Sequence, residues 1–205
     1  MAFGFGIFKW YQTLNIQNIY VTGNTILKES DIIDEAGLIN YPKIYTVNTE
    51  KIENKLSKNP LVNKVHVTKS LFGKIVITIE ENEVLYRDMA GNVMLSNGVM
   101  IEDNSYIGIP TLINEVTDVE DKFITKLRLI DKDILRRVSE ISYDPTNLDK
   151  ERFKLFMTDG NYVYITLSKI ELVNSYNEIY PTLDNKKGIL YLDSGNHFEI
   201  KTENT

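Results

Sequence analysis

Residues 59–83 read NPLVNKVHVTKSLFGKIVITIEENE, and this stretch decides the fold of the first part of the chain. Val65 and Val67 alternate with polar residues, and Ile75, Ile77 and Ile79 alternate in the same way, as side chains on one face of a strand do. Gly73 stands in the short connection between the two runs, where a tight turn favours glycine. The stretch predicts a β-hairpin, and it holds no metal cluster or phosphate loop.

The residues before this hairpin predict a strand followed by a helix. The sequence IQNIYV (16–21) predicts a short strand, and TGN (22–24) predicts the turn that ends it. Ile32, Ile33 and Ala36 then have helical spacing, with Ser30 as the nominal N-cap and Gly37 as a fitting C-terminal stop.

A second helix is better defined, because Asn48 is a good N-cap and Pro60 prevents continuation. Ile52 and Leu56 lie on one face of this helix. Residues 14–82 therefore predict the order β-α-α-β-β, a two-layer α+β module.

The residues from Glu83 onwards predict a second, β-rich domain with two helices. Apolar residues three or four apart predict helices over residues 120–141 and 169–180, the second ended by Pro181. Glycine-containing turns between apolar alternations predict hairpins at Ala90–Asn92, Asn97–Gly98 and Asp159–Gly160, and a last strand, turn and strand follow within GILYLDSGNHFEI (188–200).

Composition excludes several function classes. The chain has 205 residues, a net charge of −6 and no cysteine. The acidic balance does not suit a nucleic-acid surface, and the lack of cysteine excludes disulfides and thiol catalysis. The apolar start, MAFGFGIFKWYQT, is too short to span a bilayer. It is either an arm that packs on the domain or the outer end of a membrane anchor, and Trp10 beside Lys9 suits a membrane interface.

The order of elements resembles the POTRA domain followed by the β domain of the bacterial cell-division FtsQ/DivIB family, over residues 14–200. The residues that carry the resemblance are Val21, Gly23, Asn24, Asn59–Val62, Ile75–Glu81, the hairpin from Asp88 to Ile101, and Gly188, Leu192, Gly195 and Phe198 near the end. Lys28 stands where this family usually has a helix-starting serine, and Tyr191 where it usually has aspartate.

The resemblance implies a single-pass protein of the cell membrane, whose domains act at the division septum on the extracytoplasmic side. It implies a non-enzymatic divisome scaffold without cofactors, which binds the small membrane partners FtsL and FtsB/DivIC. We expect a juxtamembrane segment at 1–13, a POTRA domain at 14–82, a β domain at 83–195 and a C-terminal tail at 196–205. The alternative is a POTRA module of protein transport or outer-membrane assembly, but no internal repeat or barrel pattern supports it.

A partner-binding site is predicted at the last strand of the β domain. If Ile189–Asp193 lies at a sheet edge, its free N–H and C=O groups can accept a strand from another chain. The alternative is a buried central strand. The predicted site residues are Tyr176, Tyr180, Ile189, Leu190, Tyr191, Leu192, Asp193, Ser194 and Gly195. The two tyrosines of the preceding helix are either partner anchors or ordinary core residues.

Two further segments suit partner contact less well. The strand Val62–Lys69 is a second candidate edge, although its lysines and histidine are typical of a charged edge protected from aggregation. The segment 126–137 is locally basic, through Lys126, Arg128, Lys132, Arg136 and Arg137, and it is either a solvated face or a contact for an acidic partner or lipid head groups.

Catalytic and metal sites find little support. His66 and His197 are the only histidines, and they have no spacing typical of zinc ligands. Ser194 lies in DSGN rather than in a G-x-S-x-G elbow. The acidic pair Glu80-Glu81 is interpreted as the solvated exit of a strand.

Overall fold

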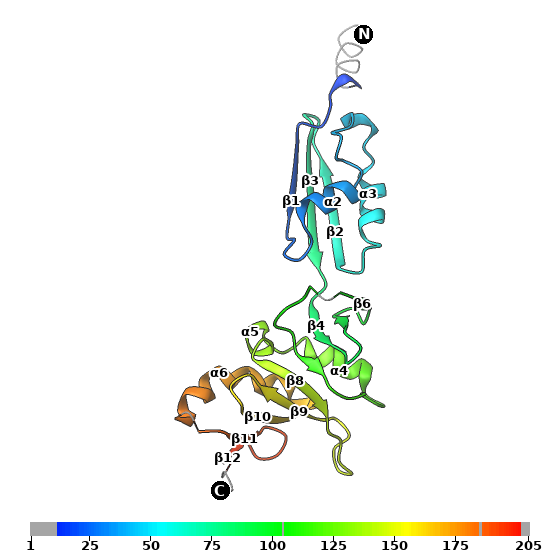
Figure 1. Ribbon diagram of the computed structural model, residues 1–205. Helices are drawn as coiled ribbons and strands as arrows, with labels where there is room; N and C mark the ends of the chain where they lie inside the picture. Colours follow the sequence, from blue (N-terminus) through cyan, green and yellow to red (C-terminus); the bar gives the residue numbers. More distant parts are fainter. Residues whose placement is uncertain (1–11, 104, 185, 202–205) are drawn as a thin grey trace. The chain divides into compact units, whose positions relative to one another are not determined.

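The computed structural model describes residues 12–103, 105–184 and 186–201 (Figure 1). The chain divides into two compact units, unit 1 up to Asn82 and unit 2 from Glu83. Each unit buries its own cluster of apolar side chains. The predicted α+β fold is confirmed. All but the last two residues of the expected juxtamembrane segment, 1–13, lie outside the described residues.

Unit 1 has the predicted β-α-α-β-β order. Its elements are β1 (Asn18–Thr22), α2 (Glu29–Glu35), the short 3-10 helix η1 (Ile44–Thr46), α3 (Thr49–Leu56), β2 (Val62–Lys69) and β3 (Lys74–Glu81). The strand order is β1-β3-β2, with β1 parallel and β2 antiparallel to the central strand. Ile75, Ile77 and Ile79 of β3 are buried in the core of unit 1, together with Ile32 of α2 and Ile52 of α3.

The predicted capping residues explain only some of the ends of α2 and α3. Asn48 caps α3 as predicted, because its Oδ1 accepts the Lys51 N–H at 2.9 Å. The prediction that Ser30 caps α2 is wrong: Lys28 is the N-cap and makes no side-chain cap bond, while Ser30 lies inside the helix. Gly37 ends α2 with φ +72°, in the left-handed region that glycine adopts at little cost.

Glu81, the last residue of β3, holds the loop between β1 and α2. Its carboxylate accepts hydrogen bonds from the N–H groups of Thr25 (2.9 Å), Ile26 (2.8 Å) and Leu27 (2.8 Å), and from the Thr25 hydroxyl (2.6 Å). Gly23 opens the same loop with φ +85°, where a Cβ would lie 2.0 Å from the Ile79 carbonyl oxygen. The interpretation of this acidic residue as solvated is therefore wrong. By contrast, Glu80 is exposed and pairs with Lys64 at 3.0 Å.

Unit 2 is built on a sheet of mixed parallel and antiparallel strands, and side chains of its helices pack in the hydrophobic core of the unit. Its strands are β4 (Val84–Arg87), β5 (Asn92–Leu95), β6 (Met100–Glu102), β7 (Thr111–Leu112), β8 (Val138–Tyr143), β9 (Arg152–Met157), β10 (Tyr162–Thr166), β11 (Gly188–Tyr191) and β12 (His197–Ile200). The strand order is β12-β11-β10-β9-β8-β7-β4-β5-β6. The turns predicted at Gly91, Gly98 and Gly160 all have positive φ and join antiparallel neighbours.

The predicted helix over residues 120–141 is wrong in its second part. The chain forms α4 (Glu120–Leu127), a single turn α5 (Lys132–Leu135) and then strand β8. The pairing of β8 with β9 shifts register between Val138 and Glu140. This bulge leaves Val138 and Ile141 both buried although they are three residues apart, and that spacing imitates a helix.

The segment predicted as a helix over residues 169–180 is helical but mostly of the tighter 3-10 type. It comprises η2 (Leu167–Ser175), α6 (Tyr176–Ile179) and η3 (Tyr180–Leu183). Pro181 does not end it, because this residue lies in the first turn of η3, where a missing N–H breaks no hydrogen bond. None of the helices in the described ranges is long and apolar enough to cross a bilayer.

Replacing Glu81 with glutamine should destabilise unit 1. Burial opposes the charge, but the hydrogen bonds from Thr25, Leu27 and Ile26 outweigh it and lower the pKa of Glu81 below its ordinary value of 4.5. The stabilisation is therefore complete above about pH 4.5 and is lost as the pH falls through the lower folded pKa. Denaturant unfolding at pH 7 should show a loss of about 1–3 kcal/mol in Glu81→Gln.

The matched control is Glu80→Gln, which removes an exposed ion pair and should cost less. The difference in the free energy of unfolding between Glu81→Gln and the unsubstituted chain should become smaller at acidic pH, as Glu81 is protonated. Equal losses for the two variants at pH 7 would show that the loop contacts of Glu81 add nothing.

Candidate partner-binding site

Strand β11 is paired on both sides. It runs parallel to β10, with Ile189 opposite Tyr162, and antiparallel to β12, with Ile189 opposite Glu199. The prediction that Ile189–Asp193 offers a free edge is therefore wrong. The chain turns back after β11 as predicted, and the predicted last strand forms as β12 over residues 197–200 of the expected tail and takes the edge position.

Gly188 allows β12 to lie close to β11. A Cβ at this position would come 2.1 Å from the Glu199 carbonyl oxygen and 2.7 Å from the Phe198 ring. The constraint is steric, because the φ of Gly188 is not in the left-handed region. Any side chain here would push β12 away, so this glycine helps decide which strand ends the sheet.

Strand β12 ends the order of described strands, and its outward amides can be assigned. The Lys201 N–H donates to the Lys187 carbonyl at 2.9 Å, so this pair is hydrogen-bonded. Antiparallel pairs alternate between bonded and non-bonded, so Glu199 and His197 face β11. The N–H and C=O groups of Phe198 and Ile200 then point outwards. The edge of the described sheet therefore lies on β12, about eight residues later than predicted.

The predicted site residues of β11 divide between two faces of the sheet. Leu190 and Leu192 are both 4% exposed and belong to the core of unit 2, so they do not meet a partner. Ile189 and Tyr191 are half-buried on the opposite face. Ser194 and Gly195 are exposed in the turn before β12.

Asp193 serves an internal ion pair. Its Oδ2 accepts from the Arg152 Nε at 2.7 Å, and the Arg152 Nη1 reaches Asp144 at 2.5 Å. Burial alone would lower the pKa of Arg152, but the hydrogen bond and charge of Asp193, with the charge of Asp144, raise it. Burial likewise opposes ionisation of Asp193, and the bonds from Arg152 and Ser194 lower its pKa. The pair ties the end of β11 to β9.

Tyr176 is a core residue rather than a partner anchor. Its side chain is 0% exposed, and its hydroxyl donates to Asp159 Oδ2 at 2.8 Å. The buried Asn161 amide donates to that hydroxyl at 3.1 Å and accepts the Gly188 N–H at 2.9 Å. Burial is the main cause of the raised pKa of Tyr176. The network joins the β9–β10 turn, α6 and the start of β11.

Tyr180 keeps part of its ring accessible. It is half-buried and stacks on Tyr176 with 6.1 Å between ring centroids. The Arg137 guanidinium lies 4.8 Å from its centroid and bonds to Asn177 Oδ1 at 2.6 Å. From the same basic segment, Lys132 pairs with Glu83 at 2.9 Å. Two of the five predicted basic residues thus have acidic, amide or aromatic partners within unit 2.

An aromatic surface that was not predicted lies on the half-buried face of β9–β12. Tyr164, Tyr191 and His197 stack across β10, β11 and β12, with centroids 5.4 Å and 4.8 Å apart. Lys154 of β9 places its ammonium 4.4 Å from the Tyr162 ring. The signal was present in the alternation YVYIT of residues 162–166, where every second residue faces the core.

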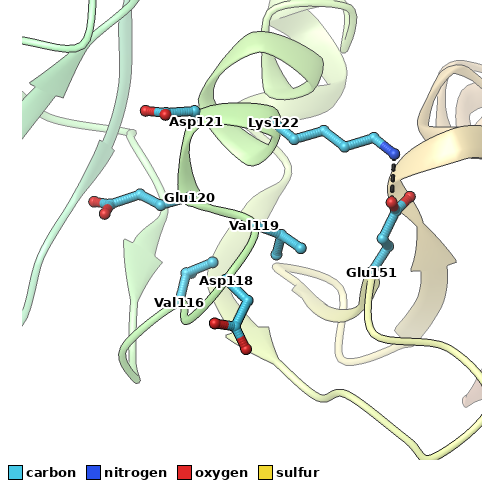
Figure 2. Close-up of a pocket in the computed structure, with 7 residues that line it drawn as sticks. All are labelled: Val116, Asp118, Val119, Glu120, Asp121, Lys122 and Glu151. Atoms are coloured by element: carbon cyan, nitrogen blue, oxygen red, sulfur yellow. Dashed lines mark hydrogen bonds and ion pairs between the residues drawn. The ribbon is translucent and has the colours of Figure 1, made fainter.

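A depression of about 480 Å³ lies at the N-terminal end of α4. Figure 2 shows that the side chains of Glu120 and Asp121 extend to the same side of the view while that of Asp118 points in another direction, so the three carboxylates do not converge. Lys122 reaches across the depression and is neutralised by Glu151. The described residues contain no group of three or more potential metal ligands.

The second predicted edge, β2, does lie at the border of the unit 1 sheet. Part of it is covered by a side chain, because the Val67 N–H donates to the Glu53 carboxylate at 2.6 Å. The same carboxylate lies 3.1 Å from Nδ1 of His66. This arrangement agrees with a protected edge, and partner binding at β2 stays a hypothesis.

Comparisons with known proteins identify the family. Residues 14–82 match the family model described as the POTRA domain, FtsQ-type. The chain is 30% identical over 200 residues to the cell division protein DivIB of Bacillus subtilis (strain 168), covering 90% of this chain and 73% of that protein. The chain belongs to the DivIB family of cell division proteins. It is also 28% identical over 194 residues to DivIB of Listeria monocytogenes, covering 90% and 72%.

A solved structure of the major extracytoplasmic domain of DivIB from Geobacillus stearothermophilus, trans isomer, is 22% identical. It covers 51% of this chain and 96% of that one, with a TM-score of 0.43. Membership of the DivIB family confirms the resemblance and gives the chain a role in cell division, with a function related to the septum.

Removing the Asn161 amide should destabilise unit 2 strongly. Asn161→Ala leaves the Gly188 N–H and the Tyr176 hydroxyl without this partner in a site closed to water. We expect a loss of about 2–5 kcal/mol in denaturant unfolding. Asn174→Ala is the matched control, since the Asn174 amide also makes two hydrogen bonds, accepting the Asp131 N–H and donating to the Leu129 carbonyl, but is only half-buried. A loss no larger than that of the control would contradict the proposed burial effect.

Adding one methyl group at Gly188 should detach β12. In Gly188→Ala the new Cβ meets the Glu199 carbonyl, so amide exchange at Glu199 and Lys201 should speed up by about tenfold or more. Gly98→Ala is the control, because a Cβ there meets nothing within 4 Å and the only cost is the positive φ of +80°. Unchanged exchange at β12 in Gly188→Ala would show that the strand adjusts without cost.

Proposed function

We propose that the chain is a non-enzymatic scaffold of the divisome, which binds small membrane division proteins of the FtsL and FtsB/DivIC type outside the cytoplasmic membrane. The membership in the DivIB family supports the division role. The observation that carries the binding mechanism is the position of β12 at the end of the unit 2 sheet. A segment of a partner adds there as a further strand.

The chemistry of the edge suits an added strand. Phe198 and Ile200 offer outward backbone groups, and main-chain hydrogen bonds supply affinity that depends little on the partner's sequence. Strand β12 is short, and Ile200 is 51% exposed. An apolar partner side chain can cover Ile200, so the edge offers both hydrogen bonds and a hydrophobic contact.

The residues around β11 contribute specificity in this proposal. Ile189 and Tyr191 lie on the half-buried face next to β12, and Ser194 and Gly195 form the turn that leads into it. Tyr180 has an accessible ring beside the cations of Arg137 and Lys187. A partner strand with aromatic or acidic side chains would therefore find complementary groups.

The cellular location is part of the same proposal. A single transmembrane helix anchors the protein in the cell membrane, and both units lie on the extracytoplasmic side at the division septum. The expected interface residues at the chain start, Lys9, Trp10 and Tyr11, support this location. Partner docking then presents an ordered complex to the machinery that builds the septal wall.

A proline at the outward edge of β12 tests the strand-addition mechanism. Ile200→Pro removes an outward N–H and leaves the bonds of Glu199 and Lys201 to β11 in place, so the fold should survive. Capture of the purified extracytoplasmic segments of FtsL-type and DivIC-type proteins should weaken about tenfold or more. Isothermal titration against each segment measures the effect.

Ile200→Ala is the matched control, because it removes the same side chain but keeps the N–H. It should weaken capture less than the proline does. If Ile200→Pro binds as tightly as Ile200→Ala, partners do not add to this edge. Uniform envelope fluorescence of a full-length fusion throughout division would contradict the septal location.

A further inference from the structure

Two adjacent apolar side chains stand exposed at one end of unit 1. Leu71 and Phe72 lie in the turn between β2 and β3, and they are 67% and 76% exposed. Tight turns between strands usually carry small or polar residues. Other strongly exposed apolar residues, such as Met89, Ile107 and Leu148, stand singly along the chain. The pair at the hairpin turn exposes a continuous apolar tip.

Three segments far apart in the sequence meet at this tip. The parallel register places Asn18 beside Lys74, so β1 begins where β3 begins (Figure 1). The Gln17 N–H donates to the Gly73 carbonyl at 2.8 Å. The loop before η1 joins them, because Ile44 N–H donates to the Leu14 carbonyl at 2.9 Å. Residues 14–18, 41–47 and 69–74 therefore share this end of the unit.

The charge of this end is opposite to that of the whole chain. The chain has a net charge of −6, yet these three segments contain no Asp or Glu. They contribute three exposed lysines, Lys43, Lys69 and Lys74. The Lys69 ammonium donates to the Val47 carbonyl, and the Lys74 ammonium lies 4.8 Å from the Tyr20 ring. Neither lysine forms an ion pair with an acidic residue in the part of the chain that the structure describes. Glu50 and Glu53 follow in α3, where Glu53 pairs with His66.

A strained tyrosine adds an independent observation. Tyr41 has φ +46°, which is unfavourable for a bulky residue. It also precedes Pro42, and a following proline favours extended backbone conformations instead. Its side chain is 44% exposed, so burial within unit 1 does little to offset the unfavourable backbone conformation. Residues with such backbone strain cluster at ligand-binding and switch positions.

We propose that this tip, formed by Leu71, Phe72, Tyr41, Lys43, Lys69 and Lys74, docks on a bilayer surface that contains anionic lipids. Leu71 and Phe72 enter the boundary between head groups and acyl chains, and the lysines contact lipid phosphates. Tyrosine suits the same boundary, because its ring is apolar and its hydroxyl is polar. We infer a lipid surface because it offers both an apolar region for Leu71 and Phe72 and negative phosphates for the lysines.

The contact is weak on its own and depends on a second attachment. Two apolar side chains and three lysines give only marginal, reversible membrane binding. This inference rests on the proposed function for that second attachment, the transmembrane anchor. Residue 14 lies next to the tip, so an anchor that precedes it would hold the tip near the bilayer and set the orientation of unit 1.

A fluorescent reporter at the tip tests the docking directly. The single tryptophan, Trp10, is replaced by phenylalanine and Phe72→Trp is added. With vesicles of phosphatidylglycerol and phosphatidylcholine, emission of this tryptophan should shift to shorter wavelength, and lipids brominated on the acyl chains should quench it. Met89→Trp in the same background is the control, since Met89 is 71% exposed in unit 2 and should not respond. A silent Phe72→Trp would overturn the proposal.

Vesicle flotation of the full chain separates the electrostatic contribution of the lysines from the hydrophobic contribution of Leu71 and Phe72. Lys74→Glu should weaken binding to anionic vesicles about fivefold or more, and Leu71→Ser with Phe72→Ser about tenfold. Ile107→Ser with Leu148→Ser is the matched pair and should bind as the unsubstituted chain does. All tip variants should still capture the division partners. Loss of partner capture with unchanged vesicle binding would make the tip a protein interface and overturn the lipid docking.

Discussion

The side-chain amide of Asn161 is the interaction on which the candidate site depends. It lies buried between three parts of unit 2 and binds the Tyr176 hydroxyl and the Gly188 N–H. An amide in such a place must have its donor and acceptor satisfied, because water cannot replace a lost partner. Asn161 thus fixes where β11 starts, and the start of β11 decides how β12 returns along it.

The position of β12 decides which part of residues 188–200 lies at the edge of the sheet. A strand that ends a sheet offers backbone groups to another chain, whereas a strand between two neighbours has none to offer. Residues 189–193 are the predicted binding edge, yet β11 is covered by four residues of its own chain. The edge of the sheet, which we propose as the binding edge, lies on β12, and Gly188 allows the close approach of β12 to β11.

Charge is distributed unevenly in unit 1, although the chain as a whole is acidic. Glu81 satisfies the loop before α2 at one end of the sheet, while the lysines of the β2–β3 turn gather at the other. This polarity along a single small sheet gives the unit one end that is held together by internal hydrogen bonds. The other end carries the exposed tip that we propose as a membrane contact.

The sequence by itself determined the hairpins, because glycine turns and period-two alternation act over a few neighbouring residues. It also determined the cap at Asn48, the stop at Gly37 and the family. It misjudged residues 136–141, because a bulge in β8 places Val138 and Ile141 on one face at helical spacing. Local patterns also left open whether Tyr176 is buried, which loop Glu81 binds and which strand ends the sheet. Only the tertiary structure decided these, since each depends on contacts between residues far apart in the chain.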